Sequence, residues 1–303
     1  MSNSPSLLLS IIIPVYNYGH FLPDAIESLV NQDFDLSNSE LILVDDGSTD
    51  HTPEVIERYA KRYPFIRAIR FPKNQGVHYA TNYPIDFAKG EYFHFMAADD
   101  FRGKNFFKRS MELLLKHPSI PICCSDPGWA SEKTGRSHLV SNSLISGVSE
   151  PTVFNSKQLV KLLRDTQFWV PGHTTILKRE VLFNYGKFNA KLGEKCDWYL
   201  VHRAALLDGI VYIPEVLAYL YSHGESYSAN IHQRAKRKAI ALEMMAQLDQ
   251  CVRTKKLFYS AGILGWAYRD YPLEFAKPKR WKAFLVLLFK KLRKEIRMRL
   301  LKS

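Results

Sequence analysis

The chain has 303 residues, 46% hydrophobic and 24% charged, a composition that supports a large folded core and excludes a disordered chain. Its four cysteines form no CxxC pair, which predicts reduced thiols in a cytoplasmic protein without a zinc site. The net charge is +12, but residues 277–303 hold eleven Lys or Arg against one acid. The basicity therefore belongs to the tail, and the body does not predict nucleic-acid binding.

Strand and helix patterns alternate along the first hundred residues. Apolar runs typical of buried strands lie at Leu7–Ile13, Glu40–Val44, Phe65–Phe71 and Glu91–Met96. Helical spacing is found between them, at His20–Gln32 and Pro53–Tyr63. This alternation predicts an α/β fold, a mostly parallel sheet flanked by helices. No basic segment precedes the first run, so it predicts a strand and not a signal peptide, and no stretch is long enough to span a membrane.

The rest of the chain is less regular. A helix is expected at Lys104–Lys116 and a strand at Ser119–Cys124, followed by a polar region without clear periodicity from Pro127 to about Ser149. Beyond about Ile231 the pattern is helical. We therefore expect a main domain over residues 1–230 and a C-terminal helical extension over residues 231–303.

Two pairs of adjacent aspartates, Asp45–Asp46 and Asp99–Asp100, end predicted strands. Ligands of parallel sheets bind beyond the carboxyl ends of the strands, so both pairs should face one crevice. Four carboxylates in one place are unfavourable unless a cation or hydrogen-bond donors offset them. Oxygen ligands of this kind suit Mg²⁺ or Mn²⁺ bound together with substrate phosphates. A solvated turn is the alternative for each pair alone, and neither a GxGxxG nor a GxxxxGK[ST] phosphate loop is present.

Five blocks of the sequence, in this order, resemble glycosyltransferase family 2, whose members have the GT-A fold. They are SIIIPVYNYGHFLPDAIESLVNQ, LILVDDGSTDHT, NQGVHYATN, AKGEYFHFMAADD and KCDWYLVHRAALLDGIVYIPEVLAYLYSHGESYS. Together they cover about Leu9 to Ser228. The resemblance implies an inverting transferase that moves a sugar from a nucleoside diphosphate donor, a UDP-sugar, to a hydroxyl of a glycan or lipid-linked acceptor in surface polysaccharide biosynthesis.

The resemblance also implies roles for individual residues. The nucleotide would be bound by Pro14, Tyr16, Asn17, Asp45, Asp46, Gly76 and Asp99. Among these, Tyr16 would pack on the base and Asp46 would accept a hydrogen bond from it. Asp100, with Asp99, would hold Mn²⁺ or Mg²⁺ at the diphosphate, where a cation offsets the charge of the leaving group. Asp197 would be the general base, and a single displacement with one base inverts the anomeric carbon.

A further block, WVPGHTTILKREVLFNYGKF, resembles the family's segment before the base. Trp169 and His173 in it are candidates for the acceptor face, because sugars stack on aromatic rings; core packing is the alternative for Trp169. For Asp197 the alternative is a helix N-cap. Arg203 on the same predicted helix is expected to form a structural ion pair.

The sequence departs from the family pattern at three places. Ala97 stands where the D.DD motif usually has its first acid, Thr81 replaces the usual arginine of an ARN motif, and Ser222 replaces the arginine before the late histidine. Phosphate neutralisation would then fall to Lys73, His78 or His223.

Residues 277–303 combine an apolar stripe with basic residues largely off it, which resembles an interfacial helix for anionic lipid. A terminal helix docked on the body is the alternative. The tail therefore predicts peripheral attachment at the inner face of the membrane. Two other functions stay open at this point: a non-catalytic glycan- or membrane-binding protein on the same fold, and a sugar nucleotidyltransferase, although the latter should have a glycine-rich phosphate loop.

Overall fold

The computed structural model of the chain describes residues 7–131, 135–141, 144–166, 168–223, 234–265 and 267. The basic tail at residues 277–303 lies outside the described residues, so its membrane contact stays a prediction. Among the helices of the described part, none combines the length and the apolar content needed to cross a membrane.

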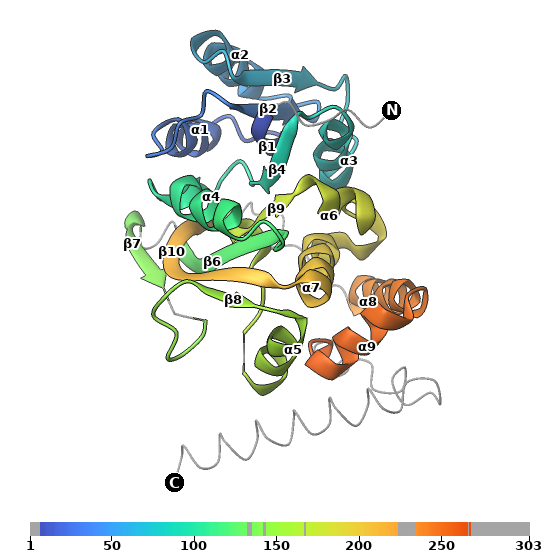
Figure 1. Ribbon diagram of the computed structural model, residues 1–303. Coiled ribbons are helices and arrows are strands. Elements are labelled where there is room, and N and C mark those ends of the chain that lie inside the picture. The colour runs from blue at the N-terminus through green and yellow to red at the C-terminus, as the bar shows by residue number, and fades with distance from the viewer. Residues whose placement is uncertain are drawn as a thin grey trace.

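The described residues form one sheet of ten strands in the order β3-β2-β1-β4-β9-β6-β10-β5, with β7 paired to β6 and β8 paired to β10 (Figure 1). The strands are β1 (Leu7–Val15), β2 (Ser39–Asp45), β3 (Ile66–Arg70), β4 (Gly90–Phe95), β5 (Phe101–Arg102), β6 (Ile122–Ser131), β7 (Gly135–Ser141), β8 (Thr152–Phe154), β9 (Ile176–Lys178) and β10 (Ile210–Ser222). β1 to β4 run parallel, as do β6 and β10, whereas the other pairs are antiparallel. The predicted α/β class is confirmed, with a parallel half at β1–β4 and a mixed second half.

Helices cover both faces of this sheet. The α-helices are α1 (Leu22–Val30), α2 (Thr52–Arg62), α3 (Val77–Asn82), α4 (Phe106–Lys116), α5 (Ser156–Asp165), α6 (Arg179–Asn184), α7 (Cys196–Asp208), α8 (Arg234–Asp249) and α9 (Val252–Ala261). Short 3₁₀ turns are η1 (Tyr83–Asp86), η2 (Gly172–Thr174) and η3 (Ala190–Lys195). Figure 1 shows α1 and α4 on one side of the sheet and α3, α6 and α7 on the other.

The central strands are apolar throughout because both of their faces are buried. In β1, Ile11 and Ile13 pack into the apolar cluster beneath α1, α2 and α4, whereas Ile12 between them packs into the cluster that includes α5 and α7. This is the two-residue alternation of a strand. Truncating a side chain such as that of Ile12 to alanine would leave a cavity that costs roughly 2–5 kcal/mol.

The described helices after residue 231 pack on the body of the protein. Met244 and Leu248 of α8 and Phe258 of α9 are buried in the same apolar cluster as α5 and α7. The helical character expected for this region is therefore observed at α8 and α9. The domain boundary at residue 230 stays a prediction.

Strand β6 extends past the point where the sequence predicts its end. It continues through Pro127 and Gly128 to Ser131, paired with β10. Proline and glycine normally end a strand or mark a bulge. Here the register shifts on both sides of Val216, which lies opposite Asp126, and Pro127 lies opposite Ala218. A Cβ at Gly128 would lie 2.2 Å from the Tyr219 ring, so this position needs glycine.

Candidate functional site

The two aspartate pairs follow neighbouring strands. β1 lies between β2 and β4, with Val15 opposite Asp45 and Ile12 opposite Phe95. The backbone N–H of Asp46 donates to the carbonyl of Val15 at 2.8 Å. The pairs therefore emerge at the carboxyl edge of the parallel half, where ligands of such sheets bind.

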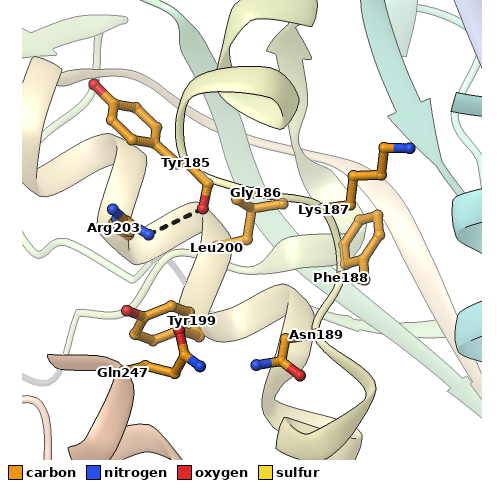
Figure 2. Close-up of a pocket in the computed structure, with 9 residues that line it drawn as sticks. All are labelled: Tyr185, Gly186, Lys187, Phe188, Asn189, Tyr199, Leu200, Arg203 and Gln247. Atoms are coloured by element: carbon orange, nitrogen blue, oxygen red, sulfur yellow. Dashed lines mark hydrogen bonds between the residues drawn. The ribbon is translucent and has the colours of Figure 1, made fainter. Parts of the chain in front are cut away.

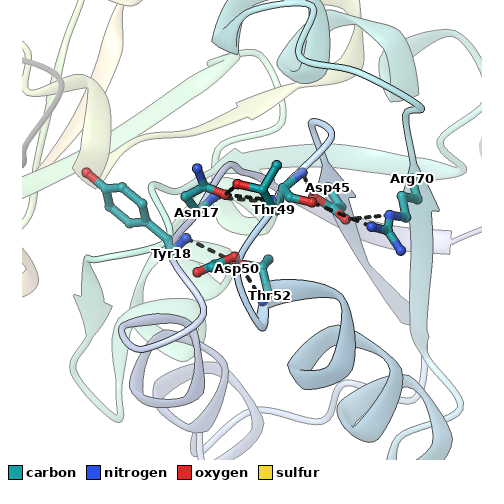
Figure 3. Close-up of polar contacts among 8 residues, drawn as sticks. Asn17, Tyr18, Asp45, Thr49, Asp50, Thr52 and Arg70 are labelled. Carbon is teal, nitrogen blue, oxygen red and sulfur yellow. Dashed lines mark hydrogen bonds and ion pairs between the residues drawn. The ribbon is translucent and has the colours of Figure 1, made fainter.

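Asp45 holds the loop after β2, and Asn17 ties that loop to the loop after β1. Its Oδ1 accepts from the backbone N–H of Ser48 at 2.8 Å, and its Oδ2 lies 3.2 Å from Nε of Arg70 (Figure 3). Asn17, at φ 56°, adopts the left-handed conformation that asparagine tolerates better than most residues. Its N–H donates to Ser48 Oγ at 3.0 Å, and its Oδ1 accepts from Thr49 N–H at 2.8 Å. The arrangement is consistent with the supporting role that the resemblance implies for Asp45.

Asp50 and Thr52 add a second set of bonds between the same loops. Asp50 accepts from the N–H of Gly19 at 3.1 Å. Asp50 also accepts from the N–H of Thr52 at 3.0 Å, while Thr52 Oγ1 accepts from Tyr18 N–H at 3.1 Å (Figure 3). Neither Asp50 nor Thr52 is among the residues to which the resemblance gives a role. Between the fixed loops, the ring of Tyr16 is 42% exposed, which leaves it accessible to a base.

Asp46 organises the loop that contains Gly76. Its two carboxylate oxygens accept from the N–H groups of Gln75 at 2.7 Å and Gly76 at 2.9 Å. Gly47 has a φ of 74°, and a Cβ there would meet Lys73 backbone at 2.5 Å, so the close approach of the two loops requires glycine. Each carboxylate oxygen has a second lone pair, so the expected bond from Asp46 to a base stays a prediction.

The second pair contacts the end of β10. Asp99 Oδ2 lies 2.8 Å from Nε2 of His223, and Asp100 Oδ1 accepts from the N–H of Tyr221 at 3.2 Å. Sequence reasoning named His223 only as a candidate for phosphate neutralisation. The late-histidine motif was the one signal that could have linked His223 to Asp99, because the two are 124 positions apart.

Burial makes the Asp100 carboxylate unfavourable as a bare charge. It raises the pKa of Asp100 to about 7; the neighbouring Asp99 adds to the rise, and the Arg102 guanidinium opposes it. A bound cation would relieve this unfavourable charge, and the carboxylate oxygens of Asp99 and Asp100 fit Mn²⁺ or Mg²⁺. The described residues hold no group of three or more side chains already arranged for a metal.

Asp197 lies in the first turn of α7, one residue after its start. The N-cap position is occupied by Lys195, whose side chain makes no capping hydrogen bond, so the N-cap alternative for Asp197 is wrong. Burial raises the pKa of Asp197, while the N–H of Trp198 and the charge of Lys195 oppose the rise. A carboxylate with a raised pKa is a better proton acceptor, as a general base requires.

The turn that carries His173 packs against Asp197. A Cβ on Gly172 would lie 2.5 Å from Asp197 Oδ2. The segment is held by the buried His202, whose Nε2 accepts from Val170 N–H at 3.2 Å. Burial lowers the pKa of His173 to about 3, and its enclosed Nε2 has no hydrogen-bond partner among the described residues. His173 is thus brought near Asp197, while the acceptor contacts of His173 and of the half-buried Trp169 stay predictions.

Arg203 forms no ion pair among the described residues, so that expectation is wrong. Its Nη1 donates to the carbonyl of Tyr185 at 3.0 Å, and its guanidinium lies 5.4 Å from the Tyr185 ring centre. It borders a cavity of about 260 Å³ (Figure 2). The other lining residues are Tyr185, Gly186, Lys187, Phe188, Asn189, Tyr199, Leu200 and Gln247.

Of the remaining candidates for phosphate contact, Lys73 is exposed and His78 Nε2 lies 3.1 Å from the carbonyl of Gly193.

Solved structures share this architecture. S. aureus TarS, residues 1–349, in complex with UDP-GlcNAc matches with a TM-score of 0.62 at 18% identity, over 84% of this chain and 73% of TarS. The mannosyltransferase PcManGT from Pyrobaculum calidifontis, in complex with GDP-Man and Mn²⁺, matches with a TM-score of 0.55 at 16% identity, over 96% of this chain and 87% of PcManGT. These likenesses confirm the expected GT-A fold.

Curated relatives match over part of their length. The minor teichoic acid biosynthesis protein GgaB of Bacillus subtilis is 30% identical over 61% of this chain, which spans only 20% of GgaB. The poly(ribitol-phosphate) beta-glucosyltransferase of Bacillus spizizenii is 28% identical over 68% of this chain and 34% of that protein. The family model described as Glycosyl transferase family 2 matches residues 10–185, more than half of the chain. The chain therefore belongs to glycosyl transferase family 2.

Proposed function

We propose that this chain is an inverting glycosyltransferase. It moves a sugar from a nucleoside diphosphate, a UDP-sugar, to a hydroxyl of a glycan or lipid-linked acceptor during the assembly of a cell-surface polymer. The observation that carries the proposal is that two acidic centres are held by different elements of the fold. Asp99 and Asp100 lie at the carboxyl edge of the sheet beside His223, whereas Asp197 packs on the turn at Gly172.

The two centres suit two tasks of one displacement. Asp197, with its raised pKa, would take the proton of the acceptor hydroxyl as that oxygen bonds to the anomeric carbon. The bond from that carbon to the diphosphate breaks, and its electron pair leaves with the diphosphate. Attack from the opposite side inverts the configuration. Asp100, with Asp99, would hold Mn²⁺ or Mg²⁺, which when bound offsets the charge on the departing diphosphate.

The nature of the donor and acceptor is supported by the relatives. TarS was solved with UDP-GlcNAc and with UDP, and PcManGT with GDP-Man and Mn²⁺. GgaB and the poly(ribitol-phosphate) beta-glucosyltransferase are named for polymers of the cell surface. The rigid loops around the exposed Tyr16 ring and Asp46 would bind the base. The basic tail would hold the enzyme at the membrane inner face, where a lipid-linked acceptor is found.

A thermal-shift screen tests the proposal. The melting temperature would be measured with UDP, GDP, UDP-GlcNAc and GDP-Man, each with and without Mn²⁺, since a ligand that binds only the folded state raises it. We expect the largest shift with a uridine nucleotide plus Mn²⁺, and the loss of the Mn²⁺-dependent part in Asp100→Ala. A protein that responds to none of the nucleotides would contradict the proposal. A response to UTP and a sugar phosphate instead would favour the nucleotidyltransferase.

A further inference from the structure

A buried hydrogen-bonded chain runs from Arg102, two residues after the acidic pair, to the turn beside Asp197. Nε of Arg102 donates to Nε2 of His94 at 2.9 Å, and Nδ1 of His94 lies 2.8 Å from the carbonyl oxygen of Thr175. Arginine can only donate, so Nε2 of His94 accepts and its proton is on Nδ1, from which it donates to Thr175. Both side chains are buried, His94 completely and Arg102 at 3% exposure. This chain of two bonds is called the Arg102–His94 relay below.

The first end of the relay belongs to the donor side of the site. Arg102 is two residues after Asp100, in the short strand β5. β5 pairs with β10 at Ala218 and Tyr219, just before the Tyr221 N–H that donates to Asp100. The position of the guanidinium is thus tied to the position of the acidic pair.

The other end of the relay belongs to the turn that supports the proposed base. Thr175 closes that turn, with its N–H donating to the carbonyl of Gly172 at 3.1 Å and its Oγ1 donating to the same carbonyl at 2.6 Å. Gly172 lies in turn against the Asp197 carboxylate. A shift of the Thr175 carbonyl would therefore move the surface on which Asp197 rests.

Core packing alone does not account for these two residues. Their neighbour Phe93 is apolar, and an apolar side chain at position 102 would avoid burying a guanidinium, which costs several kcal/mol unless it is fully paired. Arg102 is not fully paired, because its Nη2 has no hydrogen-bond partner among the described residues. That nitrogen is enclosed by protein, so it is out of reach of a substrate in this structure. Arg102 and His94 therefore act through the groups they hold.

We infer that Arg102 and His94 are positioning residues that couple the donor-side acidic pair to the turn supporting Asp197. The inference rests on the proposed function of Asp197. It predicts that breaking either bond misplaces the base while leaving nucleotide binding nearly intact. A misplacement of about 1 Å can lower a catalytic rate by a factor of the order of 100.

Three substitutions of His94 separate the two bonds. His94→Asn keeps an amide donor near the Nδ1 position toward Thr175 and loses the acceptor for Arg102. His94→Gln places an amide near the Nε2 position and loses the bond to Thr175. His94→Leu removes both. Each variant is expected to lower kcat for UDP-GlcNAc hydrolysis about 10- to 100-fold, with KM changed less than about threefold. Because the relay acts as a unit, His94→Leu, which loses both bonds, should lower kcat no further than the variants that lose one bond.

The matched control is another buried hydrogen bond of the same sheet. Ser10 Oγ donates to Glu40 Oε1 at 2.7 Å, between β1 and β2 and away from their carboxyl ends. Ser10→Ala should lower the melting temperature without changing kcat. Arg102→Lys, which keeps the charge and can still donate to His94, should recover part of the rate that Arg102→Met loses.

Hydrogen–deuterium exchange gives a readout that does not depend on the donor. The peptide covering residues 168–176 should exchange at least several-fold faster in His94→Leu than in the wild type or in Ser10→Ala. The inference would be overturned if that peptide exchanged equally fast in His94→Leu and in the wild type. It would also be overturned if kcat were unchanged in the variants and only KM rose. If wild-type hydrolysis is instead indifferent to Asp197→Asn, the proposed function has failed, and the exchange result still decides whether the relay holds the turn.

Discussion

Gly172 lies directly against the carboxylate of Asp197: a Cβ atom on Gly172 would come within 2.5 Å of Asp197 Oδ2. Position 172 must therefore be glycine for the carboxylate to keep its place. We predict that Gly172→Ala displaces Asp197 and lowers kcat for donor turnover by a factor of the order of 100. Steady-state kinetics with UDP-GlcNAc, together with a melting curve, would measure this effect.

Gly265 offers the control for that substitution. A Cβ on Gly265 meets no atom within 4 Å, so Gly265→Ala should leave kcat unchanged. If Gly172→Ala keeps the full rate as well, the carboxylate of Asp197 can move freely, and its assignment as a positioned base is weakened.

The pH dependence of turnover should report Asp197. Burial raises its pKa above the ordinary 3.8, and a base acts only when ionised, so kcat/KM should fall as pH decreases through a value above 3.8. Of the nearby histidines, His173 and His202 do not titrate in this range, because burial lowers the pKa of His173 to about 3 and that of His202 to about 4. The profile is measured at saturating Mn²⁺, because Asp100, whose pKa burial raises to about 7, would otherwise titrate in the same range. A rate that is flat from pH 8 down to pH 4 would contradict the assignment.

Asp46 should matter for nucleotide binding through the loop it holds. Asp46→Ala removes both acceptors of the Gln75 and Gly76 N–H groups, and hydrogen bonds to a charged group contribute about 1.5–3 kcal/mol each. We expect UDP to bind at least tenfold more weakly, measured by isothermal titration calorimetry with Mn²⁺. Asp35→Ala is the control, because among the described residues this carboxylate is bound only within its own turn, at Ser37. Equal affinity in Asp46→Ala and the control would exclude a role for the loop.

The sequence predicted the parallel half of the fold well because its signals are local. The apolar runs at β1 and β2 indicate that both strands are buried, and the aspartate pair at the end of β2 marks where that strand ends. The second half depends on pairings between distant segments. β10 brings His223 to Asp99 across 124 positions, and β6 continues through Pro127 because the register of its partner shifts there.

The Arg102–His94 relay shows the same limit for the site. His94 lies in an apolar strand and Arg102 follows the acidic pair, but no spacing in the sequence indicates that they meet. Arg203 was misjudged for a related reason: a charged side chain on a helix predicts an acidic partner, whereas here the partner is the backbone carbonyl of Tyr185.

Asp100→Asn should stabilise the protein when metal and nucleotide are absent. Burial raises the folded-state pKa of Asp100 to about 7, so the folded protein holds its proton more tightly than the unfolded chain does. Stability is then lost as pH rises from about 4 toward 7, and the penalty is complete above 7. At pH 8 with EDTA, Asp100→Asn should raise the free energy of unfolding by roughly 2–4 kcal/mol. The gain should vanish at pH 4, and urea denaturation at both pH values would measure it. An equal change in the free energy of unfolding at pH 4 and pH 8 would contradict the burial argument.

The most direct test of the proposed chemistry is the configuration of the released sugar. Proton NMR would follow UDP-GlcNAc, an α-linked donor, during hydrolysis by the wild type and by Asp197→Asn in the presence of Mn²⁺. A single displacement with Asp197 as base predicts that β-GlcNAc appears first, before mutarotation, and that Asp197→Asn loses at least 100-fold in rate. Initial release of α-GlcNAc, or an unchanged rate in Asp197→Asn, would contradict an inverting reaction driven by this residue.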